Sequence, residues 1–116
     1  MDQDFHPKFL NEYNRLNSEQ KLAVDTIEGP VMVIAGAGTG KTQTIAVRIG
    51  NILNQTQVNP SNILCLTFTE NAAINMRDRL IKLVGPDGYG VRISTFHGFC
   101  NSVIKDHPEY FLTSTV

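Results

Sequence analysis

Residues 31–49 read VMVIAGAGTGKTQTIAVRI, and this stretch decides the predicted fold. Its apolar start predicts a buried strand at residues 31–35, and residues 44–49 predict a helix after the loop. The glycines between them let the loop curl so that several backbone N–H groups converge on one anion. A glycine-rich turn that binds nothing is the alternative, but the flanking strand and helix favour a phosphate-binding loop.

Two side chains at the end of this loop match the chemistry of nucleotide binding. Lys41 would bring a positive charge to the β- and γ-phosphates of a nucleoside triphosphate, and the Thr42 hydroxyl would coordinate Mg²⁺. The helix that begins there would point its positive dipole end at the same phosphates. We therefore assign Lys41 and Thr42 to catalysis and predict a set of nucleotide-binding residues. These are Ala35, Gly36, Ala37, Gly38, Thr39, Gly40, Lys41, Thr42 and Gln43.

Composition sets broad limits on the class of protein. The chain has 116 residues, a length typical of one domain or a piece of one, and its 41% apolar content is ordinary for a globular protein. It contains no apolar run of about 20 residues and no N-terminal signal core, so we expect a cytoplasmic protein without membrane contact. Its net charge of −1 and the lack of a Lys/Arg block argue against nucleic-acid binding by bulk charge alone. Cys65 and Cys100 lack metal-ligand spacing, and we expect reduced, mostly buried thiols.

Strand and helix patterns alternate along the chain, which predicts an α/β fold with a parallel sheet flanked by helices. Residues 1–16 are a polar lead-in, extended or loosely helical from residue 5, and the domain begins at residue 17. The expected elements are a helix at 17–27, a strand at 31–35, a helix to about 54, a strand at 63–68, a helix at 70–83, a strand at 91–94 and a helix at 95–105. The carboxyl ends of parallel strands share one sheet edge, so the loops after all three strands should meet there.

Two of those loops combine an aromatic ring with small hydrogen-bonding groups. Residues 67–69 read Thr-Phe-Thr after the second strand, and residues 95–97 read Thr-Phe-His after the third. Such groups suit single-stranded nucleic acid, because bases stack on rings while hydroxyls and helix N-termini hold phosphates. The structural alternative places Phe68 and Phe96 in the core and makes the threonines helix N-caps. Phe99 is assigned to the core in either case.

A glutamine shortly before the first predicted strand has two possible roles. Gln20 lies in Leu-Asn-Ser-Glu-Gln, residues 16–20, at the start of a helix. A glutamine amide can donate to and accept from the edge of adenine at the same time. With Asn17 as N-cap, Gln20 is also the residue that would close a capping box. Local sequence leaves both roles open.

Taken together, these segments resemble the N-terminal part of superfamily 1 DNA helicases of the UvrD/Rep/PcrA type. The resemblance covers residues 16–104 and rests on LNSEQ at 16–20, AGAGTGKT at 35–42, LTFTENAA at 66–73 and ISTFHGFC at 93–100. It implies a partial RecA-like P-loop NTPase domain, ATP and Mg²⁺ as cofactors, and adenine recognition by Gln20. It also implies contacts to single-stranded DNA from Thr67, Phe68, Thr69, Asn71, Thr95, Phe96 and His97.

The resemblance also implies that the parent protein is an ATP-dependent 3′→5′ DNA helicase or translocase. The chain departs from the family at Glu70 and Asn71, where Asn-Lys is common, and at Gly98, where serine is usual. Hydrolysis needs an acidic pair after a strand, and no apolar run here ends in Asp-Glu. We expect residues 17–116 to be the N-terminal part of the ATP-binding domain, truncated before that strand. The rival prediction is a non-catalytic ATP-binding module.

Overall fold

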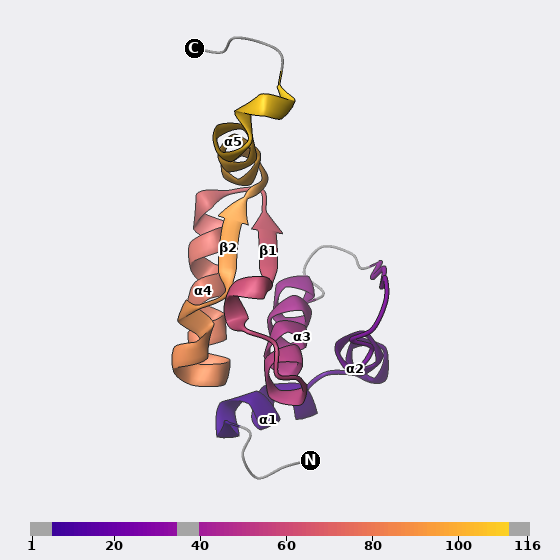
Figure 1. Cartoon of the computed structure of the whole chain (residues 1–116). Helices are drawn as coiled ribbons and strands as arrows, with labels where there is room; N and C mark the ends of the chain where they lie inside the picture. The colour runs from indigo at the N-terminus through magenta and orange to yellow at the C-terminus, as the bar shows by residue number, and fades with distance from the viewer. Residues whose placement is uncertain (1–5, 35–39, 112–116) are drawn as a thin grey trace.

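A computed structural model of the chain describes residues 6–34 and 40–111. It is an α/β structure in which helices flank a small parallel sheet (Figure 1). The helices are α1 (Pro7–Asn14), α2 (Ser18–Asp25), α3 (Lys41–Gln55), α4 (Glu70–Val84) and α5 (Phe96–Asp106). The strands are β1 (Leu64–Thr67) and β2 (Arg92–Thr95), and the 3₁₀ turns are η1 (Pro60–Asn62), η2 (Gly85–Tyr89) and η3 (Pro108–Tyr110).

The two strands pair in parallel, as the alternation of strands and helices predicted. Leu64 pairs with Arg92 at one end of the ladder and Thr67 with Thr95 at the other, so both strands stop at the same level. Helix α4 connects the strands and packs on both of them, whereas α5 continues beyond the arrowheads (Figure 1). The residues that follow β1 and β2 therefore meet at one end of the sheet.

Polar side chains set the starts of three helices. Asn17 caps α2, Thr69 caps α4 by accepting a hydrogen bond from the Ala72 N–H, and Thr95 caps α5 in the same way. Each cap satisfies a backbone donor that has no partner within its own helix. The N-cap role that sequence patterns allowed for the two threonines is thus confirmed.

Part of the lead-in predicted at residues 1–16 forms helix α1, which contributes to the core. Pro7 occupies its first turn, where the missing N–H is not needed. Phe9 is 0% exposed, and a Cβ atom placed at Gly50 would lie 3.1 Å from its ring. The buried apolar residues that form the core are Phe9, Leu16, Val24, Ala46, Val47, Ile49, Cys65, Met76, Leu80, Leu83 and Val91.

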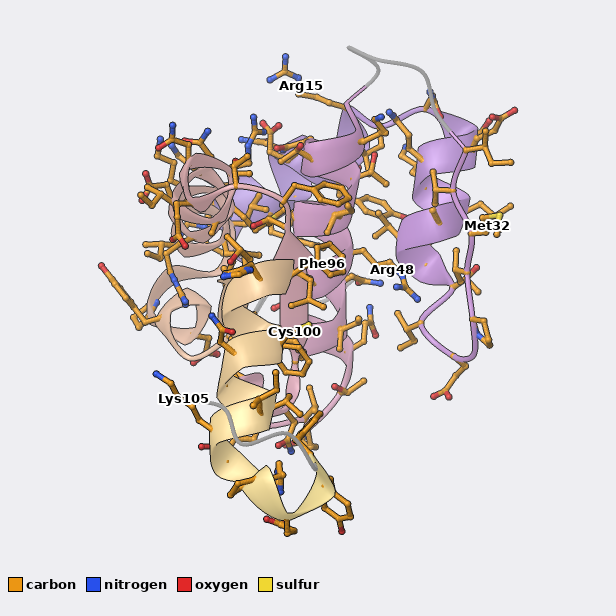
Figure 2. All side chains as sticks on the ribbon, turned by 90° about the horizontal axis from the view of Figure 1, so that it is seen from above. Arg15, Met32, Arg48, Phe96, Cys100 and Lys105 are labelled. Carbon is orange, nitrogen blue, oxygen red and sulfur yellow. The ribbon has the colours of Figure 1, made fainter. Side chains whose placement is uncertain are left out.

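The strand predicted at residues 31–35 is not formed at residues 31–34, and Ala35 lies outside the described residues. Met32 is 86% exposed and Ile34 is 90% exposed, and Figure 2 shows Met32 projecting from a segment beyond α2. A strand is stable only where a neighbouring strand takes its backbone hydrogen bonds. The described sheet contains only β1 and β2, and neither pairs with this segment. This prediction was therefore wrong for residues 31–34.

Two further predictions of burial do not hold. Phe99 is only partly buried, and α5 contains no buried residue, because it packs mainly on the ends of the two strands. Cys65 is buried as expected, and burial raises the pKa of its thiol, whereas Cys100 is exposed on α5. An amphipathic helix with a single packing surface leaves some of its apolar residues in solvent.

Candidate nucleotide and nucleic-acid sites

The start of α3 has the features of an anion site. Gly40 has φ +80°, a left-handed conformation that glycine adopts without strain. Lys41 and Thr42 are exposed in the first turn, and no side chain among the described residues caps this helix, in contrast to α2, α4 and α5. The N-terminal N–H groups and dipole of a 15-residue helix are thus available to a phosphate. The predicted loop residues Ala35, Gly36, Ala37, Gly38 and Thr39 lie outside the described residues.

Gln20 takes part in the capping box, and its amide also lies beside this helix start. Its Oε1 accepts a hydrogen bond from the Asn17 N–H at 2.9 Å, and the Asn17 Oδ1 accepts one from the Gln20 N–H at 2.8 Å. A Cβ atom at Gly40 would lie 3.5 Å from the Gln20 Nε2. Capping thus uses the oxygen of the amide and places its nitrogen next to Gly40, just before α3.

Helix α2 is held in place by contacts to α1 and α3. The Tyr13 hydroxyl donates to the Asp25 carboxylate at 2.8 Å, and the Lys21 ammonium lies 5.5 Å from the Tyr13 ring centroid. From α3, the Asn51 amide donates to the Val24 carbonyl at 3.2 Å. Arg48, labelled in Figure 2 between α3 and α2, donates to the carbonyl of Thr26. These contacts keep Gln20 close to the start of α3.

Desolvation raises the pKa of the Tyr13 hydroxyl above its ordinary value of 10.0, and the hydrogen bond and charge of Asp25 raise it further. Folded Tyr13 therefore keeps its proton at pH values at which the unfolded chain has released it. The raised pKa of Tyr13 therefore contributes to the free energy of unfolding. This contribution is constant below about pH 10 and is lost as the pH rises through the raised pKa. Tyr13→Phe should reduce the alkaline decline of the melting temperature measured from about pH 9 to pH 11.

The matched control is Tyr110→Phe, which removes a hydroxyl from an exposed tyrosine of η3. We expect its alkaline decline to equal that of the unmodified chain. A Tyr13→Phe profile with the same decline would contradict the assigned role of the Tyr13–Asp25 contact.

A pair of aromatic rings marks the other candidate site, at the end of the sheet. Phe68 follows β1 and Phe96 begins α5, and their ring centroids lie 5.1 Å apart with an interplanar angle of 34°. Phe68 is 88% exposed and Phe96 is 44% exposed, so the alternative that buried both rings in the core is wrong. The structure therefore brings together the two clusters that the sequence placed on neighbouring strands.

The polar residues predicted around the rings have partners within the chain or face solvent. The Thr67 hydroxyl donates to the Thr69 carbonyl at 3.1 Å, while Asn71 and His97 are exposed. The nucleotide candidates at the start of α3 and on α2 lie apart from this end of the sheet (Figure 1). Residues 31–34 form no strand, and most of the loop predicted after them lies outside the described residues, so in the described part of the chain the loops after β1 and β2 share the sheet edge.

Comparison with known proteins decides the family. The family model described as the UvrD/REP helicase N-terminal domain matches residues 16–112. The chain belongs to the UvrD/REP helicase family. It is 44% identical over 92 residues to the ATP-dependent DNA helicase PcrA of Staphylococcus aureus (strain Mu50 / ATCC 700699), covering 79% of this chain and 13% of the relative. It is 46% identical over 99 residues to DNA helicase II of Rickettsia typhi, covering 85% of this chain and 15% of the relative.

The chain thus spans about one seventh of the length of the UvrD/REP relatives it matches. A probable DNA helicase II homolog of Rickettsia conorii is similar in the same way, with 44% identity over 82% of this chain and 14% of the relative. Helix α1, at Pro7–Asn14, precedes the first residue matched by the family model. Its packing on α3 and α4 is therefore evidence from this structure alone.

Two kinds of feature are absent from the described part of the chain. No helix at residues 6–34 or 40–111 combines the length and apolar character needed to cross a membrane. The same residues hold no group of three or more His, Cys, Asp or Glu side chains placed to bind a metal. The Mg²⁺ expected from the sequence would instead depend on the Thr42 hydroxyl and on the nucleotide.

Sequence reasoning missed the partners of Gln43. Its side-chain amide donates to the Glu12 carboxylate at 2.8 Å and accepts a hydrogen bond from the Arg79 guanidinium. A nucleotide contact by Gln43 would thus come from its backbone N–H. The three residues lie on three different helices, far apart in sequence, so no local pattern could have indicated their contact.

Proposed function

We propose that this chain is the ATP-binding and single-strand-contacting part of an ATP-dependent 3′→5′ DNA helicase, in a RecA-like P-loop domain. The observation that carries the proposal is the uncapped start of α3, with Lys41 and Thr42 exposed beside the Gln20 amide. Family membership supports it, since one relative is named ATP-dependent DNA helicase PcrA. The proposed nucleotide ligands are Gln20 and residues 35–43.

In this proposal each nucleotide ligand has a defined task. Lys41 neutralises charge on the β- and γ-phosphates, and the N–H groups at the start of α3 donate to phosphate oxygens. The Thr42 hydroxyl is the chain's ligand to Mg²⁺, which supplies charge neutralisation when bound. Gln20 donates from Nε2 to adenine while its Oε1 remains in the capping box.

The proposed DNA contacts are Thr67, Phe68, Thr69, Asn71, Thr95, Phe96 and His97. The geometry of the two rings indicates which of them a base would stack on. A base between two rings needs about 7 Å, twice the optimal carbon–carbon separation. The Phe68 and Phe96 centroids are 5.1 Å apart, which is too close. A base would therefore stack on the outer face of Phe68, with Phe96 supporting the ring from behind.

Replacing Phe68 with alanine tests the DNA part of the proposal. One base stacked on an aromatic ring contributes about 1–3 kcal/mol to the binding free energy. We therefore expect the affinity for a labelled oligo(dT) to fall by about tenfold or more when the ring is removed. Fluorescence anisotropy at fixed salt measures this affinity. Tyr89→Ala, which removes a 69% exposed ring in η2, is the matched control and should bind as the unmodified chain does. Equal affinity of the Phe68→Ala variant would contradict the stacking role.

A second candidate function is a nucleotide-binding module without hydrolysis. It is favoured by the residues that end the strands, Thr67 and Thr95, because neither strand supplies the acidic pair that positions Mg²⁺ and water. Phosphate release from ATP by the 116-residue chain, with and without oligo(dT), separates the two functions for this stretch. Nucleotide binding without release would select the module, and turnover would exclude it.

A further inference from the structure

Gln43 connects three helices through one side chain. Its Nε2 donates to the Glu12 Oε1 of α1 at 2.8 Å, and its Oε1 accepts from the Arg79 Nη1 of α4. A carboxylate can only accept and a guanidinium can only donate, so the orientation of the amide is determined by its neighbours. Glutamine is suited to this position because one end of its amide donates and the other accepts.

This bridge lies directly beside the proposed phosphate ligands. Gln43 follows Lys41 and Thr42 in the first turn of α3, where a small shift of the helix moves all of its N-terminal donors together. Helix α4 begins at Glu70, immediately after the Thr69 cap and the proposed DNA-contacting turn. The bridge therefore joins the start of the nucleotide-binding helix to the body of the helix that follows this turn.

Helix α1 is the third helix joined by the Gln43 bridge, and apolar packing holds it in place. Phe9 is fully buried, with its ring against Gly50 of α3. Glu12 lies one turn further along α1, and its second oxygen accepts a hydrogen bond from Arg15 at 3.4 Å. Glu12 is thus anchored on a helix that precedes the family match and is too far from Lys41 in sequence to be found by motif.

We infer that Gln43 is a positioning residue of the nucleotide site, whose amide holds the first turn of α3 against Glu12 of α1 and Arg79 of α4. The inference rests on the proposed nucleotide binding and assigns the side chain of Gln43 to the protein rather than to the ligand. Affinity for a nucleoside triphosphate then depends on Glu12 and Arg79, which act through Gln43.

A charge exchange tests this inference. Gln43→Glu retains the contact to Arg79 but places two carboxylates together, and we expect it to weaken binding of a fluorescent ATP analogue with Mg²⁺ by about tenfold. Adding Glu12→Gln restores the hydrogen bond with the two groups exchanged, because the new amide at position 12 would donate to the new carboxylate at position 43. The double variant should bind within about twofold of Glu12→Gln alone, the matched baseline.

The outcomes separate the inference from the function it rests on. A direct effect of the new carboxylate on the nucleotide would weaken the single and double variants equally, and that result would overturn the inference. Unchanged affinity in Gln43→Glu would overturn it as well. If circular dichroism shows that Gln43→Glu does not fold, Arg79→Met replaces it as the test, because Arg79 is at an exposed position. We expect Arg79→Met to lower the affinity for the ATP analogue by about fivefold, and an unchanged affinity would refute the bridge. Failure of the unmodified chain to bind would instead refute the proposed function.

Discussion

Replacing Lys41 with alanine is expected to weaken nucleoside triphosphate binding by about a hundredfold while leaving the fold intact. Lys41 is exposed in the first turn of α3, and its side chain is not part of the core. Hydrogen bonds to charged groups contribute about 1.5–3 kcal/mol, and the lost interaction here is a full charge on a triphosphate. Titration with a fluorescent ATP analogue measures the loss, and circular dichroism measures the helical signal.

The matched control is Lys105→Ala, which removes the same side chain from the last turn of α5. It lowers the net charge by the same amount, so it separates the effect of position from that of overall charge. We expect it to bind nucleotide within about twofold of the unmodified chain, as distant surface charges are screened by salt. Equal affinities for all three proteins would remove the phosphate-site assignment.

Replacing Phe9 with alanine is expected to lower the free energy of unfolding by about 3–5 kcal/mol. The ring is 0% exposed, lies against Gly50 and stacks on Tyr13 with centroids 6.1 Å apart. Its removal leaves a cavity between α1 and α3 that close-packed helices fill only in part. Because small domains are stable by only about 5–15 kcal/mol, this loss is a large share of the total. Urea unfolding followed by circular dichroism measures it.

Phe68→Ala in the same assay is the control, since it makes the same chemical change at a side chain that is 88% exposed. We expect it to change the free energy of unfolding by less than about 0.5 kcal/mol. A Phe9→Ala variant no less stable than Phe68→Ala would show that α1 is not part of the core. The two variants together thus separate a stability role at one end of the molecule from a proposed DNA role at the other.

Local sequence patterns predicted most of the helices and both observed strands. Asn17, Thr69 and Thr95 cap the helices that their residue types indicated, because an N-cap bond involves only neighbours in the chain. The meeting of the two aromatic clusters at one end of the sheet could also be predicted, since parallel strands bring their carboxyl ends to one edge. The sequence left two roles open for Gln20, and the structure shows that they involve different atoms of one amide. Its Oε1 takes part in the capping box, while its Nε2 lies beside Gly40.

The failures share one physical cause, which is dependence on partners distant in sequence. Residues 31–34 have the composition of a buried strand but form none, because a strand needs hydrogen-bonding neighbours that the described sheet does not supply. Phe99 is assigned to the core from the sequence, yet it is only partly buried, since burial depends on what packs against α5. In each case the pattern describes what a segment can do, and its neighbours decide whether it does so.

The amino-acid sequence by itself determined the family, the starts of α2, α4 and α5, the parallel strand pair and the residues proposed to hold nucleotide and DNA. These depend on local backbone chemistry and on motifs a few residues long. Only the tertiary structure decided that Phe9 is buried, that the Phe68 and Phe96 rings touch, and that Gln43 joins Glu12 to Arg79. Such contacts form between elements far apart in the chain, where packing and hydrogen-bond geometry select the partners.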